Sequence, residues 1–363
     1  MGAVEEAEQY WSRYGALSRR LLNSDPKNPV YVMELSYTLA NMGALEQMKT
    51  VPDLDLSLEL LQMGVRYTQI ALLLDPGNQE YREAQITQLS WLADAWLEKC
   101  ALGNALKVRR QTVDLRRGLV REKPKDSYQK RELAYTLTGL AGVQEMIGVN
   151  SFSRSSYQEA IALLQDLHGD EPENGNIEWQ LLYRSTRLAR LLHATGHSDD
   201  AVDIIFPFAH RAEELSRSDV ASDKYVAIEA ARFKVDYALL LLQQGHKEKG
   251  REQLTGAVEM VSAQIVAHPG FRDGFTELVI ASFEYWREFG VMPGGIASQQ
   301  LLEFQSVPDT MKSCRMAGLG ARMAVMNGDD GRASELTGYL LDRGYFKADF
   351  VGFCRQYGLC TKP

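Results

Sequence analysis

Hydrophobic side chains recur every three or four positions through most of the chain, with polar side chains between them. The apolar or small residues of two such segments fall on one side of a helix: Leu137, Leu140, Ala141 and Met146 in the first, and Tyr157, Ile161 and Leu164 in the second. The Val/Ile/Thr-rich alternation that is typical of strands does not occur between them. The pattern therefore predicts amphipathic helices and no sheet.

Two kinds of turn divide these helices. The first four turn prolines, Pro26, Pro76, Pro124 and Pro172, stand 50, 48 and 48 residues apart. The next turn is expected at 218–223, which contains no proline, and later turn prolines follow at Pro269 and Pro308. Glycines mark a second turn at Gly148, Gly196, Gly245, Gly290 and Gly328. Glycine fits the left-handed position that closes a helix, and proline with Asp or Ser starts the next one. Each unit is thus predicted as two helices joined by a glycine turn.

One helix pair of this kind cannot bury both of its faces, so it must stack on its neighbours, and the outcome is an all-α superhelical solenoid. Small residues twelve positions apart recur where the two helices of a pair would cross: Ala93/Ala105, Ala189/Ala201, Ala238/Gly250 and Ala321/Ala333. Helix axes approach to about 8–10 Å only where side chains are small.

This spacing resembles the tetratricopeptide repeat (TPR) family, in its long-unit bacterial form. The resemblance implies a right-handed solenoid of about seven antiparallel helix pairs plus a C-terminal cap. The units here are longer than the roughly 34 residues of that family, and 270–306 is a divergent unit.

Both ends depart from the repeat. We expect 1–343 to form the array, with 4–24 as the second helix of a truncated unit, and 344–363 to form the cap through Phe346, Phe350, Phe353 and Tyr357. We therefore expect the chain to be the C-terminal part of a larger protein.

Composition narrows the function classes. The net charge of −8 argues against a chain that binds nucleic acid over its whole surface. No apolar run approaches the roughly 20 residues that span a membrane, and the first 25 residues do not resemble a signal peptide. Four scattered cysteines are interpreted as reduced thiols of a cytoplasmic protein; Cys354 and Cys360 could pair, but burial as free thiols is favoured.

Candidate chemistry is sparse. His193 and His197 are four residues apart, but Gly196 separates them and no acidic third ligand follows at a zinc-site spacing. Neither a nucleophile elbow nor a phosphate-binding loop is present. We expect no enzyme activity, metal or cofactor.

Charge gathers in 107–131, which holds ten basic and three acidic residues. Arg109 and Arg116, like Arg110 and Arg117, are seven apart and share a helix face, so they form a candidate basic patch for an acidic partner, an upstream domain or a nucleic-acid backbone. The favoured alternative is a solvated helix face paired with acidic neighbours.

The resemblance also implies a concave groove lined by the first helices. The positions carried over are Tyr37, Asn41, Ser90, Asp94, Glu98, Tyr135, Thr138, Glu145, Tyr183, Thr186, Arg190, His193, Arg232 and Gln243. Tyr37, Tyr135 and Tyr183 would anchor a partner, or else only pack between adjacent first helices.

These patterns predict a protein–protein interaction scaffold that binds a partner peptide or domain, as a module of a bacterial signalling or regulatory protein. The alternatives are a substrate-positioning region of an enzyme whose catalytic domain lies upstream, and a nucleic-acid-associated regulator that uses 107–131.

Overall fold

The computed structural model describes residues 2–49, 52–209, 214, 224–268, 272–294, 297, 299–301 and 313–360. Within these ranges the regular structure is helical throughout, as the hydrophobic pattern predicts. The chain divides into two compact units, Met1–Val143 and Gln144–Pro363. The predicted turns at 218–223, Pro269 and Pro308 lie outside the described residues.

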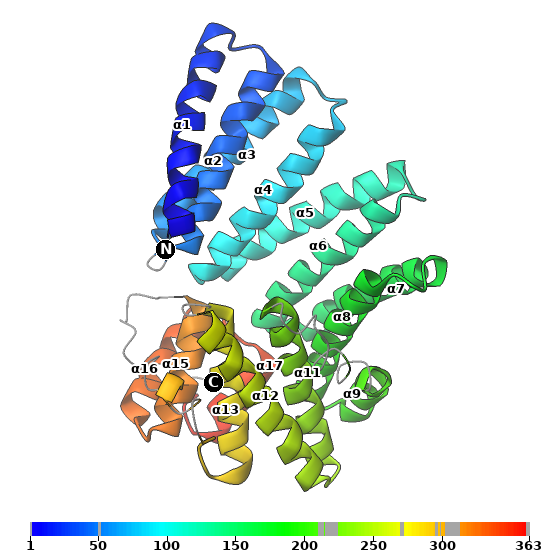
Figure 1. Ribbon diagram of the computed structural model, residues 1–363, viewed down its shortest axis with the longest axis vertical. Coiled ribbons are helices and arrows are strands. Elements are labelled where there is room, and N and C mark those ends of the chain that lie inside the picture. Colours follow the sequence, from blue (N-terminus) through cyan, green and yellow to red (C-terminus); the bar gives the residue numbers. More distant parts are fainter. Residues whose placement is uncertain are drawn as a thin grey trace. The chain divides into compact units, whose positions relative to one another are not determined.

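The first unit begins with a single helix, α1 (Gly2–Ser24), which packs on α2. Figure 1 shows the helices that follow as successive antiparallel pairs. They are α2 (Pro29–Met48) with α3 (Leu54–Leu74), α4 (Gln79–Glu98) with α5 (Leu102–Glu122), and α6 (Ser127–Met146), which carries the boundary between the units in its last turn. First helices also contact one another, as α2 does with α4.

The second unit continues the same alternation (Figure 1). Its helices are α7 (Asn150–Asp170), α8 (Gly175–Ala194), α9 (Ser198–Ile205) with a 3₁₀ turn at Phe206–Phe208, α11 (Lys224–Gln243), α12 (Lys247–Ala267), α13 (Arg272–Phe289), α15 (Cys314–Met326), α16 (Asp330–Leu341) and α17 (Ala348–Gln356). The first helices α8, α11, α13 and α15 contact one another in that order.

Proline turns start the first helices through a side chain that stands two residues after the proline. In DPKN, DPGN and EPEN the final Asn28, Asn78 and Asn174 are N-caps, and each side-chain oxygen accepts a backbone N–H of the next helix turn. Asp126 does the same for Gln129 at 3.2 Å. Capping satisfies donors that the first helical turn leaves unpaired, so this four-residue turn fixes where each first helix begins.

The glycine turns are confirmed. All five predicted glycines have a positive φ, between 70° and 84°: Gly148, Gly196, Gly245, Gly290 and Gly328. The pair α4·α5 has no glycine at this place, and Cys100 adopts a φ of 58° there instead. The left-handed conformation is costly for a residue with a Cβ, so the turn geometry is imposed by the packing of the two helices around it.

Each predicted small pair lies at a helix crossing. The alanines of all four pairs are buried, and a Cβ added at Gly250 would stand 3.3 Å from the backbone oxygen of Ala238. Each crossing joins the two helices of one unit, as in α4·α5, α8·α9, α11·α12 and α15·α16. The predicted all-α array of stacked helix pairs is therefore confirmed.

The first pair crosses through glycines that the pattern of small pairs did not include. A Cβ at Gly64 in α3 would stand 3.1 Å from the backbone nitrogen of Ala40 and 3.2 Å from the backbone oxygen of Ser36. Ser36 Oγ donates to the carbonyl of Gly64 at 2.8 Å, and Ser57 Oγ donates to that of Gly43 at 2.8 Å. The two backbones are thus in contact and tied by serines.

We expect Gly64→Val to lower the free energy of unfolding by about 1–3 kcal/mol, because the added methyl groups meet backbone atoms that cannot turn aside. Urea denaturation followed by circular dichroism measures this. Gly118→Val in α5 is the matched control, since nothing lies within 4 Å of a Cβ there. Equal midpoints for the two variants would contradict the close crossing.

Candidate partner-binding surfaces

The predicted groove positions of the first unit are largely occupied by contacts within the chain. Tyr37 OH donates to Glu80 Oε1 of α4 at 2.9 Å, so this tyrosine links adjacent first helices. Burial and the Glu80 hydrogen bond raise the pKa of Tyr37. Asn41 Nδ2 donates to the Tyr37 carbonyl at 2.8 Å, and Ser90 Oγ donates to that of Ile86 at 3.0 Å.

Tyr135 is the most exposed of these positions in the first unit. Its side chain in α6 is 60% exposed. Thr138, on the next turn of the same helix, is buried and donates to the Ala134 carbonyl at 2.7 Å. Asp94 pairs with Arg109, and Glu98 is partly buried at the end of α4. Tyr135 is therefore the first-unit groove residue best placed to touch a partner.

A ladder of ion pairs joins the first helices of the second unit. Arg190 Nε in α8 donates to Asp236 Oδ1 in α11 at 2.8 Å. Arg232 in α11 pairs with Glu277 in α13 at 2.6 Å, and it also pairs with Glu229 on its own helix. A third rung, Arg315 in α15 with Asp273 in α13, is more exposed. We call these three inter-helix pairs the charge ladder.

The acidic partners of the charge ladder were missed by the sequence analysis. Asp236 lies 46 residues after Arg190, and Arg315 lies 42 residues after Asp273, which is close to one repeat. Opposite charges one unit apart on successive first helices are a signal that the sequence contains. Comparing each groove position with the same position in the next unit would have found them.

Tyr183 lies between two arginines of α8. The guanidinium of Arg187 is 4.6 Å from the centre of its ring and that of Arg184 is 5.7 Å from it. Contacts of this kind attract a cation to the face of an aromatic ring. Thr186 is buried and donates to the carbonyl of Leu182 at 2.8 Å, whereas Tyr183 and Arg187 are partly exposed.

His193 and His197 lie at neighbouring helix ends. His193 Nδ1 lies 3.2 Å from Ser198 Oγ, and His197 is the N-cap residue of α9. Burial lowers the pKa of His193, and Asp236 and a hydrogen bond with Gln243 partly offset the effect. Gln243 itself is exposed at the end of α11. Among the residues that the structure describes, no group of three or more His, Cys, Asp or Glu side chains could hold a metal ion.

The four arginines of the basic patch do not share one surface. Arg109 and Arg116 are buried between α5 and its neighbours. Arg116 pairs with Glu83 and donates to Gln129 Oε1 at 3.0 Å, and Arg109 pairs with Asp94. A Cβ at Gly139 of α6 would stand 3.1 Å from Arg109 Cζ, so this glycine makes room for the guanidinium. Arg110 is exposed and Arg117 is half-buried.

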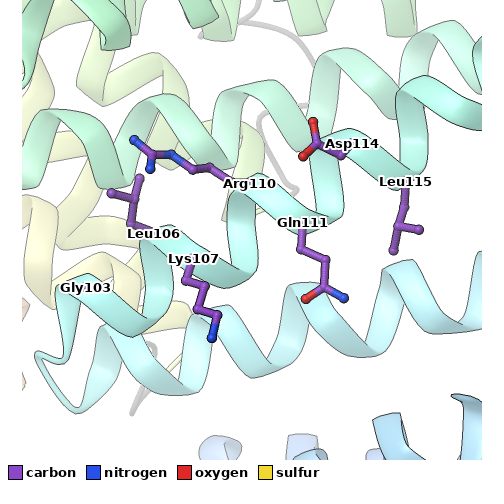
Figure 2. Close-up of a pocket in the computed structure, with 7 residues that line it drawn as sticks. All are labelled: Gly103, Leu106, Lys107, Arg110, Gln111, Asp114 and Leu115. Carbon is purple, nitrogen blue, oxygen red and sulfur yellow. The ribbon is translucent and has the colours of Figure 1, made fainter.

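A shallow hollow of about 550 Å³ lies along the outer side of α5. Figure 2 shows its lining: one row of side chains is Lys107, Gln111 and Leu115, and the other is Leu106, Arg110 and Asp114. Each row keeps the four-residue spacing of one helix face. Because basic, acidic and apolar groups alternate here, the hollow has no strong preference for one charge.

The C-terminal segment lies against the first helices of the second unit. Residues 345–347, which we call the cap linker, precede α17 without regular structure. The N–H of Phe346 donates to the carbonyl of Met146 in α6 at 2.7 Å. Lys347 Nζ lies 3.3 Å from Glu145 Oε1, and Asp349 lies 3.2 Å from Arg322 of α15.

Electrostatics favour the charged forms of both cap residues. Burial by itself raises the pKa of Asp349, but Lys347 and Arg322 outweigh it and lower the pKa to about 2. Burial likewise opposes the charge of Lys347, and Asp349 and Glu145 outweigh it and raise the pKa. The side chain of Asp349 is 34% exposed, so water screens part of this attraction.

Aromatic contacts fix α17, which is red in Figure 1, against α13. Phe353 meets Phe283 edge to face with ring centres 5.4 Å apart, and Tyr357 stacks on Trp286 at 6.2 Å. The cap therefore contacts helices of several helix pairs of the second unit, and not only the last pair. Cys354 and Cys360 form a disulfide with their Cα atoms 5.2 Å apart. None of the four cysteines is a free thiol, so the interpretation as reduced thiols is wrong.

No protein-family model and no curated protein sequence matches this chain. Solved structures do match. A Rap protein complexed with Competence and Sporulation Factor has a TM-score of 0.58 at 12% sequence identity, over 98% of this chain and 91% of that chain. BtubC (BKLC) from P. vanneervenii has a TM-score of 0.52 at 15% identity, over 74% of this chain and 94% of that chain.

The fold is a TPR-like helical repeat array. The TPR-like helix pairs, the glycine turns and the small crossing residues agree with the resemblance drawn from the spacing of residues. At these identities the similarity concerns the fold alone. None of the TPR-like helices described is both long and apolar enough to cross a membrane.

Proposed function

We propose that this protein is a protein–protein interaction scaffold, in which the first helices bind a segment of a partner. The charge ladder carries the proposal. Its three rungs place both signs of charge on successive first helices. Asp236 and Glu277 are buried in their pairs, whereas the outermost pair, Arg315 with Asp273, is partly open to solvent. The open pair offers a donor and an acceptor to a polypeptide of mixed charge, and electrostatic complementarity of this kind selects partners.

Each compact unit also contributes groove residues of its own. Tyr135 in the first unit is 60% exposed, and Tyr183 and Arg187 in the second unit are partly exposed. Aromatic and arginine side chains are enriched at interfaces. The Rap protein with a similar fold was solved with a factor bound, which supports binding as the role of the array. The proposed partner is a peptide or protein, and the proposed setting is a bacterial signalling or regulatory protein in the cytoplasm.

The two alternative functions receive less support. The basic stretch keeps Arg110 and Arg117 outside, but Arg109 and Arg116 are paired inside the first unit. Fewer phosphates could therefore be contacted than the count of charges indicated. Nothing in the described residues favours a substrate-positioning role, so the proposal is a binding protein and not an enzyme.

The proposal is tested by capture of partners from the source organism on the immobilised protein. Tyr135→Ala/Tyr183→Ala should weaken retention of a specific partner at least about fivefold, because truncating even one anchor aromatic costs more than about 1 kcal/mol. Arg110→Ala/Arg117→Ala is the control on the other surface and should retain the partner. Loss of every partner by the arginine variant, with full retention by the tyrosine variant, would move the site to α5.

A further inference from the structure

The cap linker makes the contacts that a bound peptide would make. It is extended at Lys347, with φ −56° and ψ 133°. Its main chain donates from Phe346 N to the Met146 carbonyl, which the end of α6 leaves free because a helix does not use its last carbonyls. A Cβ at Gly148 would stand 2.9 Å from the carbonyl oxygen of Phe346, so glycine is needed for the linker to approach this closely.

Two side chains of the segment enter charged positions on the first helices. Lys347 meets Glu145, whose other oxygen accepts from Tyr157 OH at 3.3 Å. Tyr157 is fully buried, so Glu145 is held in place before any ligand arrives. Asp349 meets Arg322 of α15. Glu145 was predicted as a groove residue from its position in the repeat, and it is bound by the chain's own lysine.

The linker is buried unevenly: Tyr345 is buried against Phe350 of α17, whereas Phe346 and Lys347 lie nearer the surface. Phe346 has 47% of its surface exposed. Phe350, Phe353 and Cys354 of α17 are buried. The contacts at Met146, Glu145 and Arg322 can therefore open while the aromatic contacts of α17 remain.

We propose that the cap linker and the first turn of α17 are a displaceable internal ligand. The site formed by Glu145, Met146 and Arg322 then takes a segment of a partner protein that is extended up to a lysine or arginine and begins a helical turn there, with an aspartate or glutamate two positions later. This rests on the proposed function and names the partner's chemistry. Such a segment reproduces the Lys347 and Asp349 contacts, and its main chain replaces that of Phe346.

The internal ligand sets the apparent affinity. A tethered segment competes at a local concentration in the millimolar range, so a free peptide binds the intact protein weakly. A binding site that is open for only part of the time lowers the apparent affinity by that fraction. Weakening the linker's own contacts therefore strengthens the binding of a free competitor.

The test uses a fluorescein-labelled peptide GYFKAD, the sequence of residues 344–349 with blocked ends, and fluorescence anisotropy on the full chain. Lys347→Ala should bind it at least about tenfold more tightly than the unchanged protein, because the internal lysine no longer competes for Glu145. Adding Glu145→Gln should remove this gain, and the peptide GYFAAD should bind Lys347→Ala at least about tenfold more weakly than GYFKAD.

Hydrogen exchange at the Phe346 amide gives a second measurement on the unchanged protein. Saturating GYFKAD should speed this exchange about tenfold or more, since the peptide removes the bond to Met146. Unchanged protection while the peptide is bound, or equal affinity for Lys347→Ala and the unchanged protein, would overturn the proposal. If that happened, the Tyr135→Ala/Tyr183→Ala variant could still lose its captured partners. The proposed function and the internal-ligand proposal can therefore fail separately.

Discussion

Replacing Arg116 with methionine should lower the free energy of unfolding by about 3–5 kcal/mol. Arg116 is 2% exposed in α5. It holds Glu83 of α4 and Gln129 of α6 at once, so it ties the second helix of one unit to the first helices on either side. Removing one member of a buried pair leaves the other charge without compensation, which costs more than the pair itself contributes.

Urea denaturation followed by circular dichroism measures the effect, with Arg110→Met as the matched control. Arg110 lies on the same helix but is exposed, so its replacement should change stability by no more than about 0.5 kcal/mol. Arg116→Met/Glu83→Leu should recover most of the loss, because the carboxylate closest to Arg116 is removed with it and the remaining partner, Glu132, is partly exposed. Equal urea midpoints for Arg116→Met and Arg110→Met would show that Arg116 is not a buried, stabilising residue.

The burial of Arg109 and Arg116 could have been found from the sequence. The buried face of α5 runs through Ala105, Arg109, Thr112, Val113 and Arg116, at spacings of three and four. Ala105 was already assigned to the helix crossing, so the two arginines four and eleven positions later share its face. Counting charges in 107–131 hid this, because a count does not distinguish the faces of a helix.

Turns and crossings could be predicted because they depend on a few neighbouring residues. A left-handed turn favours a glycine, as at Gly148, and a close helix crossing requires a small residue, as at Ala201, so each can be recognised from a single position. Groove positions were harder. The repeat phase gives the direction of a side chain, but Thr138 and Thr186 bond to carbonyls of their own helices instead of facing a partner.

Contacts between distant parts of the chain were beyond the sequence analysis. Glu145 and Lys347 belong to different ends of the second unit, and no periodic pattern relates them. The cap was expected from its aromatic residues, but its contact with the end of α6 depends on the path of all the helices between. The disulfide of Cys354 and Cys360 also depends on local geometry after α17, which a spacing of six residues does not fix.

Phe350→Ala should remove about 3–5 kcal/mol of stability from the cap, because a buried aromatic leaves both lost contacts and a cavity. Phe350 is 1% exposed and meets Tyr345 edge to face at 5.2 Å and Phe353 at 6.2 Å. It thus joins the cap linker to the helix that anchors it. Burial raises the pKa of Tyr345 to about 12, as expected for a ring enclosed by this contact.

Hydrogen exchange measured by mass spectrometry over residues 345–356, together with urea denaturation, reports the loss. The matched control is Phe152→Ala in α7 of the same unit, whose ring is 64% exposed and whose removal should change stability by no more than about 0.5 kcal/mol. If Phe350 anchors α17 while Lys347 only seats the linker, Phe350→Ala exposes all of 345–356, whereas Lys347→Ala exposes the linker alone. Equal exchange profiles for these two variants would show that the cap opens as one piece, and α17 could then not stay docked while a partner replaces the linker.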